Sequence, residues 1–321
     1  MKKKDRKPHI AGLGEEPYND DDMAIRIPAL SDIVFKYIFG AEESVDILKT
    51  LINAVLSDAG FDEIESIAVV NPFNVKTYLD DKPSIIDTRA KDVKGNKYNV
   101  EVQVRSQADF QERSLYYWAK SYSNQLREGQ EYGTLNKVIS ISIVDFPLFP
   151  AGIPFHSCFM LRENNNPEYV LTEDCILHYL EVPKLEGKPE TEAEKWMYFL
   201  RHADEEDETM KVLLDNDVMF KTARQRYDYF LADEKARMAY LARSMFLHDQ
   251  ASFIAEARNK GLEEGKAEGR AEGRAEGRAE GRAEGEREKA LKTARKLRSR
   301  GLSPQEISEI TGISPEEAEG L

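Results

Sequence analysis

The chain has 321 residues, a hydrophobic content of 41% and a formal net charge of −14. This length allows one large or two small domains. The acidic balance argues against a surface coated in lysine and arginine for nucleic-acid binding, although it does not exclude a protein that contacts only a few phosphates. Two cysteines are too few for a disulfide framework or a zinc cluster.

The N-terminal segment, residues 1–24, is polar and interrupted by glycine and proline, which predicts a solvated tail. Its basic start, Lys2 to Lys7, leads into polar residues and not into the apolar stretch of a signal peptide. No segment reaches the apolar length of a membrane span. We therefore expect a cytoplasmic protein with no membrane partner.

Two helices are predicted next. Ser31 suits the N-cap of the first helix and Gly40 suits its end. A second helix over about residues 43–59 has apolar positions at helical spacing. These predicted core positions are Val34, Tyr37 and Ile38 in the first helix, and Val45, Leu48, Leu51, Ile52 and Val55 in the second.

The most informative stretch is residues 85–104, which predicts two strands joined by a tight turn at residues 94–96. The first strand carries Asp87. In the second strand polar and apolar residues alternate, so Asn99, Glu101 and Gln103 share one face. The opposite face is expected to meet a core through Tyr98, Val100, Val102 and Val104.

Asp87 and Glu101 have two interpretations. Carboxylates on adjacent strands can converge on one divalent cation, a layout suited to Mg²⁺-dependent phosphodiester chemistry. The alternative is that both are charges on the solvated face of a hairpin.

The following segments complete an α/β pattern. A helix is expected over residues 108–128, with Arg113, Tyr117 and Lys120 on one face. Residues 138–144 predict a buried strand, residues 154–161 and 169–182 predict further strands, and residues 191–260 predict helices. A helix followed by the order β-β-α-β indicates a small mixed sheet flanked by helices.

Several motifs, taken in order, resemble a known family. The spacing Asp87-x(13)-Glu101-x-Gln103 is similar to the PD-(D/E)xK nuclease core, with Gln in place of Lys. Residues 32–40 resemble the DxxFKxxFG opening of the Rpn family of recombination-promoting nucleases, which are also labelled transposases. The other similar segments are RSLYYWAKSY at 113–122, VISISIVDFPLF at 138–149, LTED at 171–174 and YLEVPK at 179–184.

The resemblance covers roughly residues 25–260 and implies a restriction-endonuclease-like core with a helical C-terminal extension. It implies that Asp87 and Glu101 bind Mg²⁺, with Mn²⁺ or Ca²⁺ as alternatives and the backbone carbonyl of Val102 as a third ligand. Gln103 would help to orient the attacking water. Lys120 or Arg113 would supply the positive charge that a lysine at position 103 would otherwise carry.

Three further residues are candidates for a supporting role. Asp32 either reaches the metal, as an acidic residue on the first helix does in many nucleases of this superfamily, or interacts favourably with the helix dipole. Lys36 belongs to the same opening motif, and Tyr117 lies between Arg113 and Lys120.

The function implied is a metal-dependent DNA endonuclease of low sequence specificity that promotes recombination. The alternative is a catalytically weak DNA-binding or assembly protein of a mobile-element or defence system. Retention of Asp87, Glu101 and Gln103 favours the enzyme. The acidity and the C-terminal segment favour the alternative.

Glycine recurs at every fourth position from Gly261 to Gly285, within four copies of Ala-Glu-Gly-Arg at residues 267–282. Each glycine costs about 1 kcal/mol relative to alanine in a helix, so an isolated helix is expected to be marginal. The repeat is either an adjustable spacer or one half of a helix pair, in which Glu stripes meet Arg stripes of a second copy in a homodimer.

The chain ends with a basic segment, residues 286–300, and two predicted capping boxes that begin at Ser303 and Ser314. Ile307, Ile310 and Ile313 form a small apolar stripe, which predicts a docking or oligomer-capping element. The expected division is a tail at 1–24, a nuclease core at 25–150, a β-rich extension at 151–190, helices at 191–260, the repeat at 261–285 and a short helical hairpin within 286–321.

Overall fold

The computed structural model describes residues 26–70, 72 and 88–321. These fall into two compact units, which divide between Arg243 and Ser244 and are considered separately. The prediction for Asp87 falls on a residue outside the described ranges.

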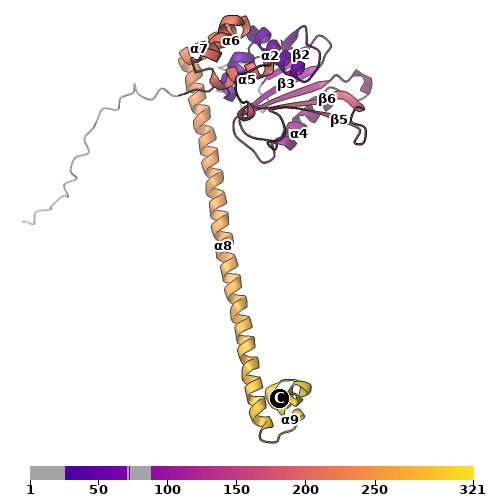
Figure 1. The fold of residues 1–321 in the computed structure, drawn as a ribbon, viewed down its shortest axis with the longest axis vertical. Helices are drawn as coiled ribbons and strands as arrows, with labels where there is room; N and C mark the ends of the chain where they lie inside the picture. Colours follow the sequence, from indigo (N-terminus) through magenta and orange to yellow (C-terminus); the bar gives the residue numbers. More distant parts are fainter. Residues whose placement is uncertain (1–25, 71, 73–87) are drawn as a thin grey trace, which may run out of the picture. The chain divides into compact units, whose positions relative to one another are not determined.

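A six-stranded mixed sheet is the centre of the first unit. Its order is β1-β2-β3-β4-β6-β5; β3, β4 and β6 are parallel, and the outer pairs are antiparallel. This arrangement, flanked by helices, confirms the predicted α/β fold class (Figure 1). The strands are β1 (Ile67–Val69), β2 (Thr88–Asp92), β3 (Lys97–Gln103), β4 (Val138–Val144), β5 (His156–Arg162) and β6 (Val170–Glu181).

The turn between β2 and β3 is built as predicted, around Gly95 with φ of 93°. Asp92 fixes it, because its Oδ1 accepts hydrogen bonds from the backbone N–H groups of Lys94 and Asn96, both at 2.9 Å. The expectation for Val104 is wrong: β3 ends at Gln103, and Val104 is 43% exposed because it lies beyond the last paired residue.

One face of the sheet is covered by helices that close a large apolar core. They include α1 (Asp32–Phe39), α2 (Val45–Asp58), α5 (Glu192–His202) and α7 (Val218–Ala232), and α6 (Glu208–Asn216) packs beside α7. Val100 and Val102 of β3 face this core, as the strand alternation predicted. Short 3₁₀ turns occur at Glu42–Ser44, Tyr132–Thr134 and Val182–Lys184.

The caps of α1 differ in detail from the sequence expectation. Ser31 occupies the N-cap position, but its side chain makes no capping hydrogen bond. Instead Asp32 Oδ1 accepts from the backbone N–H of Ile33 at 2.8 Å. Gly40 ends the helix at φ −93°, so its stop does not use the left-handed conformation available to glycine.

The opposite face of the sheet meets α4 (Phe110–Ser123), which connects β3 to β4. Trp118 Nε1 donates to the carbonyl of Val138 at 2.9 Å and joins the helix to the sheet. A second apolar cluster packs the start of α4 against the sheet. It consists of Phe110, Val144, Phe146 and Tyr179. The helix is shorter than predicted and ends at Ser123.

A buried histidine pair links α2 to the far edge of the sheet. Asp58 Oδ2 lies 2.6 Å from Nδ1 of His156, whose Nε2 lies 3.0 Å from Nδ1 of His178. His178 is fully buried, and burial, followed by the charge of His156, lowers its pKa to about 3.

This pair predicts a loss of stability in acid. The unfolded chain binds a proton at His178 below a pH of about 6.5, whereas the folded chain does not until about pH 3. The free energy of unfolding should therefore fall as pH decreases between these values, by up to about 1.4 kcal/mol per pH unit from this group. Urea titrations at several pH values should show a shallower dependence for His178→Gln, while a control at exposed His248 leaves it unchanged; equal slopes would contradict the assignment.

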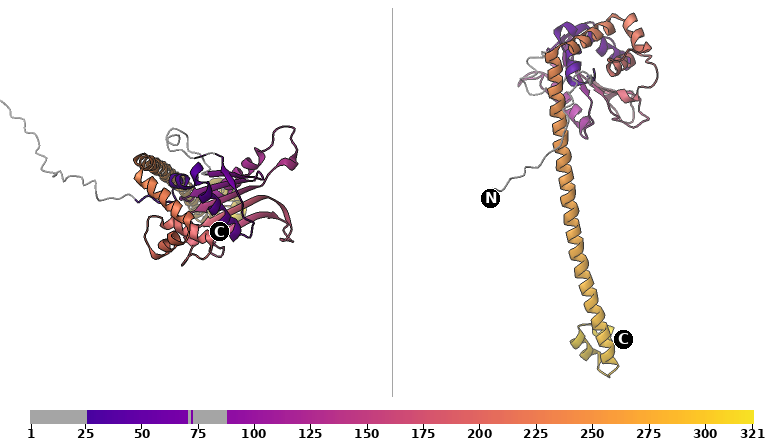
Figure 2. Two further views of the ribbon diagram at one scale, coloured as in Figure 1. Left: turned by 90° about the horizontal axis from the view of Figure 1, so that it is seen from above. Right: turned by 90° about the vertical axis from the view of Figure 1, so that its left-hand side faces the viewer.

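The repeat lies within one helix, α8 (Glu234–Arg298), which runs without a break through all four Ala-Glu-Gly-Arg copies (Figures 1 and 2). A Cβ placed on any glycine from Gly261 to Gly285 meets nothing within 4 Å. The glycines are therefore not required by close packing within the described part of this chain. None of the helices that the structure describes combines the length and the apolar character of a bilayer span.

The end of α8 packs with α9 (Pro304–Thr311) and α10 (Pro315–Glu319) around Ala294, Ile307, Ile313 and Ala318. The capping box at Ser303 is complete. At Ser314 the hydroxyl accepts from the N–H of Glu317, but the carboxylate of Glu317 pairs with Arg287. Ile310 is 60% exposed, so its place in the predicted apolar stripe is wrong.

Alanine at Gly265, Gly273 and Gly281 should stabilise α8 by about 1 kcal/mol per site, because each site has room for a methyl group. Amide hydrogen exchange within the repeat should slow accordingly. If the glycines instead face a second copy, the same changes would lower the oligomer mass measured by analytical ultracentrifugation, which would favour the helix-pair prediction over the spacer.

Candidate active site

The sheet face under α4 is polar where β3 and β4 lie side by side. Alternation along β3 places Asn99 and Glu101 on this face, and the parallel register with β4 sets them beside Ser140 and Ser142. A small cavity of about 10 Å³ lies here, bounded by these four side chains together with Ser114, Tyr117 and Ile141. The site therefore lies between the sheet and α4.

Glu101 is held by a cation from α4. Its Oε1 lies 2.9 Å from Nη2 of Arg113, and only 11% of its side chain is exposed. The same Nη2 donates to Gln103 Oε1 at 3.2 Å, and Gln103 Nε2 donates to the carbonyl of Arg105 at 2.9 Å. Arg113 also donates to Gln107, and its guanidinium lies over the Phe110 ring, 5.1 Å from the ring centre. One arginine thus orients both the carboxylate and the amide.

The predicted residues on α4 divide between two places. Arg113 joins Glu101 and Gln103, and Tyr117 borders the small cavity beside them. Lys120 borders a larger, neighbouring cavity, which also includes Tyr117. Of the two cations considered from the sequence, Arg113 is therefore the one paired with Glu101.

The predicted residues on α1 do not border the small cavity. Asp32 Oδ2 forms an ion pair of 3.0 Å with Nε of Arg243, and Lys36 is buried on the same helix. The side chain of Val102 lies in the apolar core, so only its backbone carbonyl could act as a ligand, and that role stays a prediction.

Sequence reasoning placed Asn99 on the same face as Glu101 but missed Ser140 and Ser142 as their neighbours. The signal was present in β4, where serine alternates with isoleucine, but the strand was interpreted only as buried. Placing the serines next to Glu101 required the register between β3 and β4, which strand periodicity alone does not give.

The donor atoms around Glu101 suit a hard cation. The side chains that border the small cavity or bond to Glu101 supply carboxylate, amide and hydroxyl oxygens, and among these described residues there is no thiol or imidazole. Oxygen ligands of this kind are those that Mg²⁺ and Ca²⁺ prefer.

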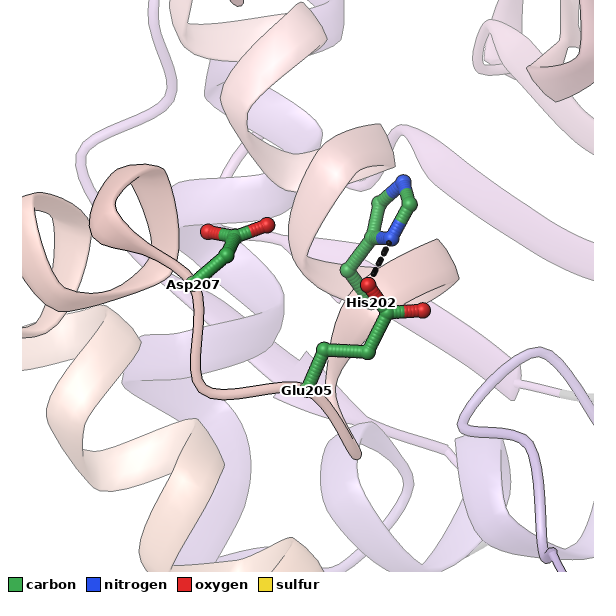
Figure 3. Close-up of side chains that lie close together, drawn as sticks. All are labelled: His202, Glu205 and Asp207. Carbon is green, nitrogen blue, oxygen red and sulfur yellow. Dashed lines mark hydrogen bonds and ion pairs between the residues drawn. The ribbon is translucent and has the colours of Figure 1, made fainter.

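A separate cluster of potential metal ligands consists of His202, Glu205 and Asp207, near the start of α6 (Figure 3). The histidine spacing in the sequence did not reveal it. Glu205 Oε2 lies 2.9 Å from His202 Nδ1. Asp207 caps α6 through the N–H of Met210 at 2.7 Å and accepts from the Tyr198 hydroxyl. Helix capping therefore accounts for Asp207, and a hydrogen bond to each other accounts for His202 and Glu205.

A family model described as "PD-(D/E)XK nuclease family transposase" matches residues 29–257. The chain belongs to this family. The match covers the whole sheet and α4, and it ends before the first glycine of the repeat. No curated protein and no solved structure matches the chain. Membership in this nuclease family agrees with the resemblance found in the sequence, and Glu101 lies on the third strand of the matched region.

Proposed function

We propose that the chain is a metal-dependent endonuclease that hydrolyses phosphodiester bonds in DNA with low sequence specificity, and that the resulting breaks promote recombination. The main support is the position of Glu101. It is a nearly buried carboxylate, paired with Arg113 and surrounded by oxygen donors, in a chain of a nuclease family.

Asp87 and Glu101 are the proposed metal ligands, with Mg²⁺ as the preferred ion and the Val102 carbonyl as a further ligand. Thr88 pairs with Val100, and Asp87 and Glu101 are the next residues along the sequence on either side of that pair. This relation is the reason for proposing that the two carboxylates act together. When bound, the cation would supply polarisation of the phosphate and a lower pKa for an attacking water.

The protein groups have distinct proposed roles. The Gln103 amide orients the water by hydrogen bonding, since it carries no charge. Arg113 keeps Glu101 and Gln103 turned to the same side and presents N–H groups to phosphate oxygens, which guanidinium binds well. Asp32, Lys36 and Tyr117 remain supporting candidates.

The test is cleavage of supercoiled plasmid with Mg²⁺, Mn²⁺ or Ca²⁺, and with EDTA to remove the metal. We expect nicking with Mg²⁺ or Mn²⁺, none with EDTA, and none for the Asp87→Ala/Glu101→Ala double variant. The matched control Glu168→Gln changes an exposed carboxylate outside the site and should cleave normally. Cleavage that persists in EDTA or in the double variant would contradict the proposal.

The second candidate is a DNA-binding or assembly protein with weak catalysis. The observation that favours it is the long exposed helix α8, whose repeat lies outside the family match. Deleting residues 261–321 should change the oligomeric state under this candidate. Unchanged cleavage and an unchanged oligomeric state after the deletion would remove a regulatory or assembly role for the tail.

A further inference from the structure

A second, larger cavity of about 510 Å³ lies beside Glu101, between β2, β3 and α4. Among the described residues four cationic side chains border it and no carboxylate does: Arg89, Lys91, Lys97 and Lys120. This concentration of positive charge stands in a chain whose formal net charge is −14. Charge of one sign gathered in a concave site attracts ligands of the opposite sign.

The cluster follows from the hairpin and from α4. Exposed and buried side chains alternate along β2. Arg89 and Lys91 are exposed on one face of the strand, and Thr88, Ala90 and Asp92 are buried on the other. The register pairs Lys91 with Lys97 and Arg89 with Asn99. Lys120 reaches the same cavity from α4.

The described part of the chain does not neutralise these cations. Within it none of the four forms an ion pair, and Lys120 Nζ lies 6.0 Å from the centre of the Tyr116 ring. Burial lowers the pKa of Lys97, and Lys91 and Arg89 lower it further by repulsion. The arrangement therefore costs stability in the absence of an anion.

Asn99 provides an independent observation. It is 6% exposed, and its Nδ2 has no hydrogen-bond partner among the residues that the structure describes. It borders both the basic cavity and the small cavity of Glu101. A buried donor without a partner is costly unless a ligand satisfies it, and this donor lies among four cations.

We propose that the basic cavity binds a backbone phosphate of the DNA strand, next to the phosphate that is cleaved at Glu101. The proposal rests on the proposed function. Tyr117 and Asn99 border both cavities, so the two sites are neighbours and one DNA strand can occupy both. The volume lies in the range of small-ligand sites, so it can admit a nucleotide unit with its phosphate. Lys120 is then a phosphate anchor, separate from the Glu101 centre.

The first test measures DNA binding by the full chain in EDTA, by fluorescence anisotropy of a labelled duplex over a range of salt concentrations. The Lys91→Ala/Lys97→Ala variant should bind about tenfold more weakly for each lysine–phosphate hydrogen bond that it removes. The slope of log K against log salt should fall by about 1 for each phosphate that is no longer neutralised. The matched control Lys211→Ala/Lys221→Ala removes two exposed lysines outside the cavity and should change neither value.

The second test distinguishes a role of these side chains in DNA binding from a role in folding, by the sign of the change in melting temperature. Lys97→Met and Asn99→Leu should each raise the melting temperature, because the first relieves repulsion and the second replaces a buried donor without a described partner by an apolar side chain of similar shape. Both should weaken DNA binding. Lower stability together with weaker binding would indicate that these side chains only support the fold, and would overturn the proposal.

A competitor identifies the source of the phosphate. Inorganic phosphate at millimolar concentration should displace labelled DNA only weakly from the intact protein; displacement as complete as that by unlabelled duplex would show a site for free phosphate instead.

The binding measurements do not depend on catalysis, so they can be compared with the cleavage assay. If plasmid cleavage is absent but binding depends on Lys91 and Lys97, the proposed function fails and only the phosphate-binding part of this inference stands. If cleavage needs Glu101 but replacing the cations does not change binding, the proposed function stands and this inference fails.

Discussion

Plasmid cleavage by Glu101→Gln is expected to be slower by a factor of about 1,000. The reason is that a metal ligand is removed: metal ions contribute several kcal/mol to catalysis, and each 1.36 kcal/mol corresponds to a tenfold change in rate. Glutamine keeps the shape of the side chain, so Arg113 retains a hydrogen-bond acceptor. Initial rates of supercoiled-plasmid nicking at saturating Mg²⁺ measure the effect.

Arg113→Ala provides the companion measurement. It removes the Arg113 guanidinium from the nearly buried Glu101 carboxylate, and the loss of this one ion pair should lower the free energy of unfolding by about 3 kcal/mol. The double variant Glu101→Gln/Arg113→Ala should recover part of that stability, since no buried charge remains. Additive stability changes would show that the two side chains do not interact, and normal cleavage by Glu101→Gln would remove Glu101 from the site.

Glu181→Ala is expected to destabilise the first unit by about 4 kcal/mol, because it leaves two partly buried backbone donors and one cation without this partner. The carboxylate is fully buried at the end of β6. Its Oε1 accepts from the N–H groups of Leu148 and Phe149 at 2.6 and 3.0 Å, and its Oε2 lies 2.7 Å from Lys184 Nζ. Chemical denaturation of the full chain measures the change.

The matched control is Glu173→Ala, which breaks an ion pair with Lys137 at an exposed position. Solvent screens that pair, so the control should change stability little. The double variant Glu181→Ala/Lys184→Met should be less destabilised than the two single changes predict together. A small effect of Glu181→Ala would mean that water replaces the carboxylate.

The sequence predicted the placement of side chains correctly where one periodicity decided the outcome. Alternation along β3 assigned Val100 and Val102 to the core and Glu101 to the opposite face, and Gly95 marked the turn. Helical spacing also grouped Arg113 with Tyr117. These are local properties, set by a strand repeat of two or a helix repeat of 3.6.

The remaining features depend on contacts between distant segments. The spacing on α4 could not decide between Arg113 and Lys120, because the choice depends on how the helix lies over β3. The YLEVPK motif was recognised as part of the family resemblance, but no physical reason for these residues was apparent from the sequence. The structure supplies one, since Glu181 binds a loop 33 residues earlier in the chain. Val104 and Ile310 followed the local pattern but lay beyond the packed surface.

The four-residue period of α8 has a consequence for how the gene can change. One Ala-Glu-Gly-Arg unit lengthens a helix by about 6 Å and rotates its end by about 40° beyond a full turn. Copies can therefore be gained or lost while the helix stays continuous, and α9 and α10 keep their packing on its last turns. Because repetitive coding sequence readily expands and contracts, we expect the number of copies to differ between close relatives while the nuclease region keeps its length.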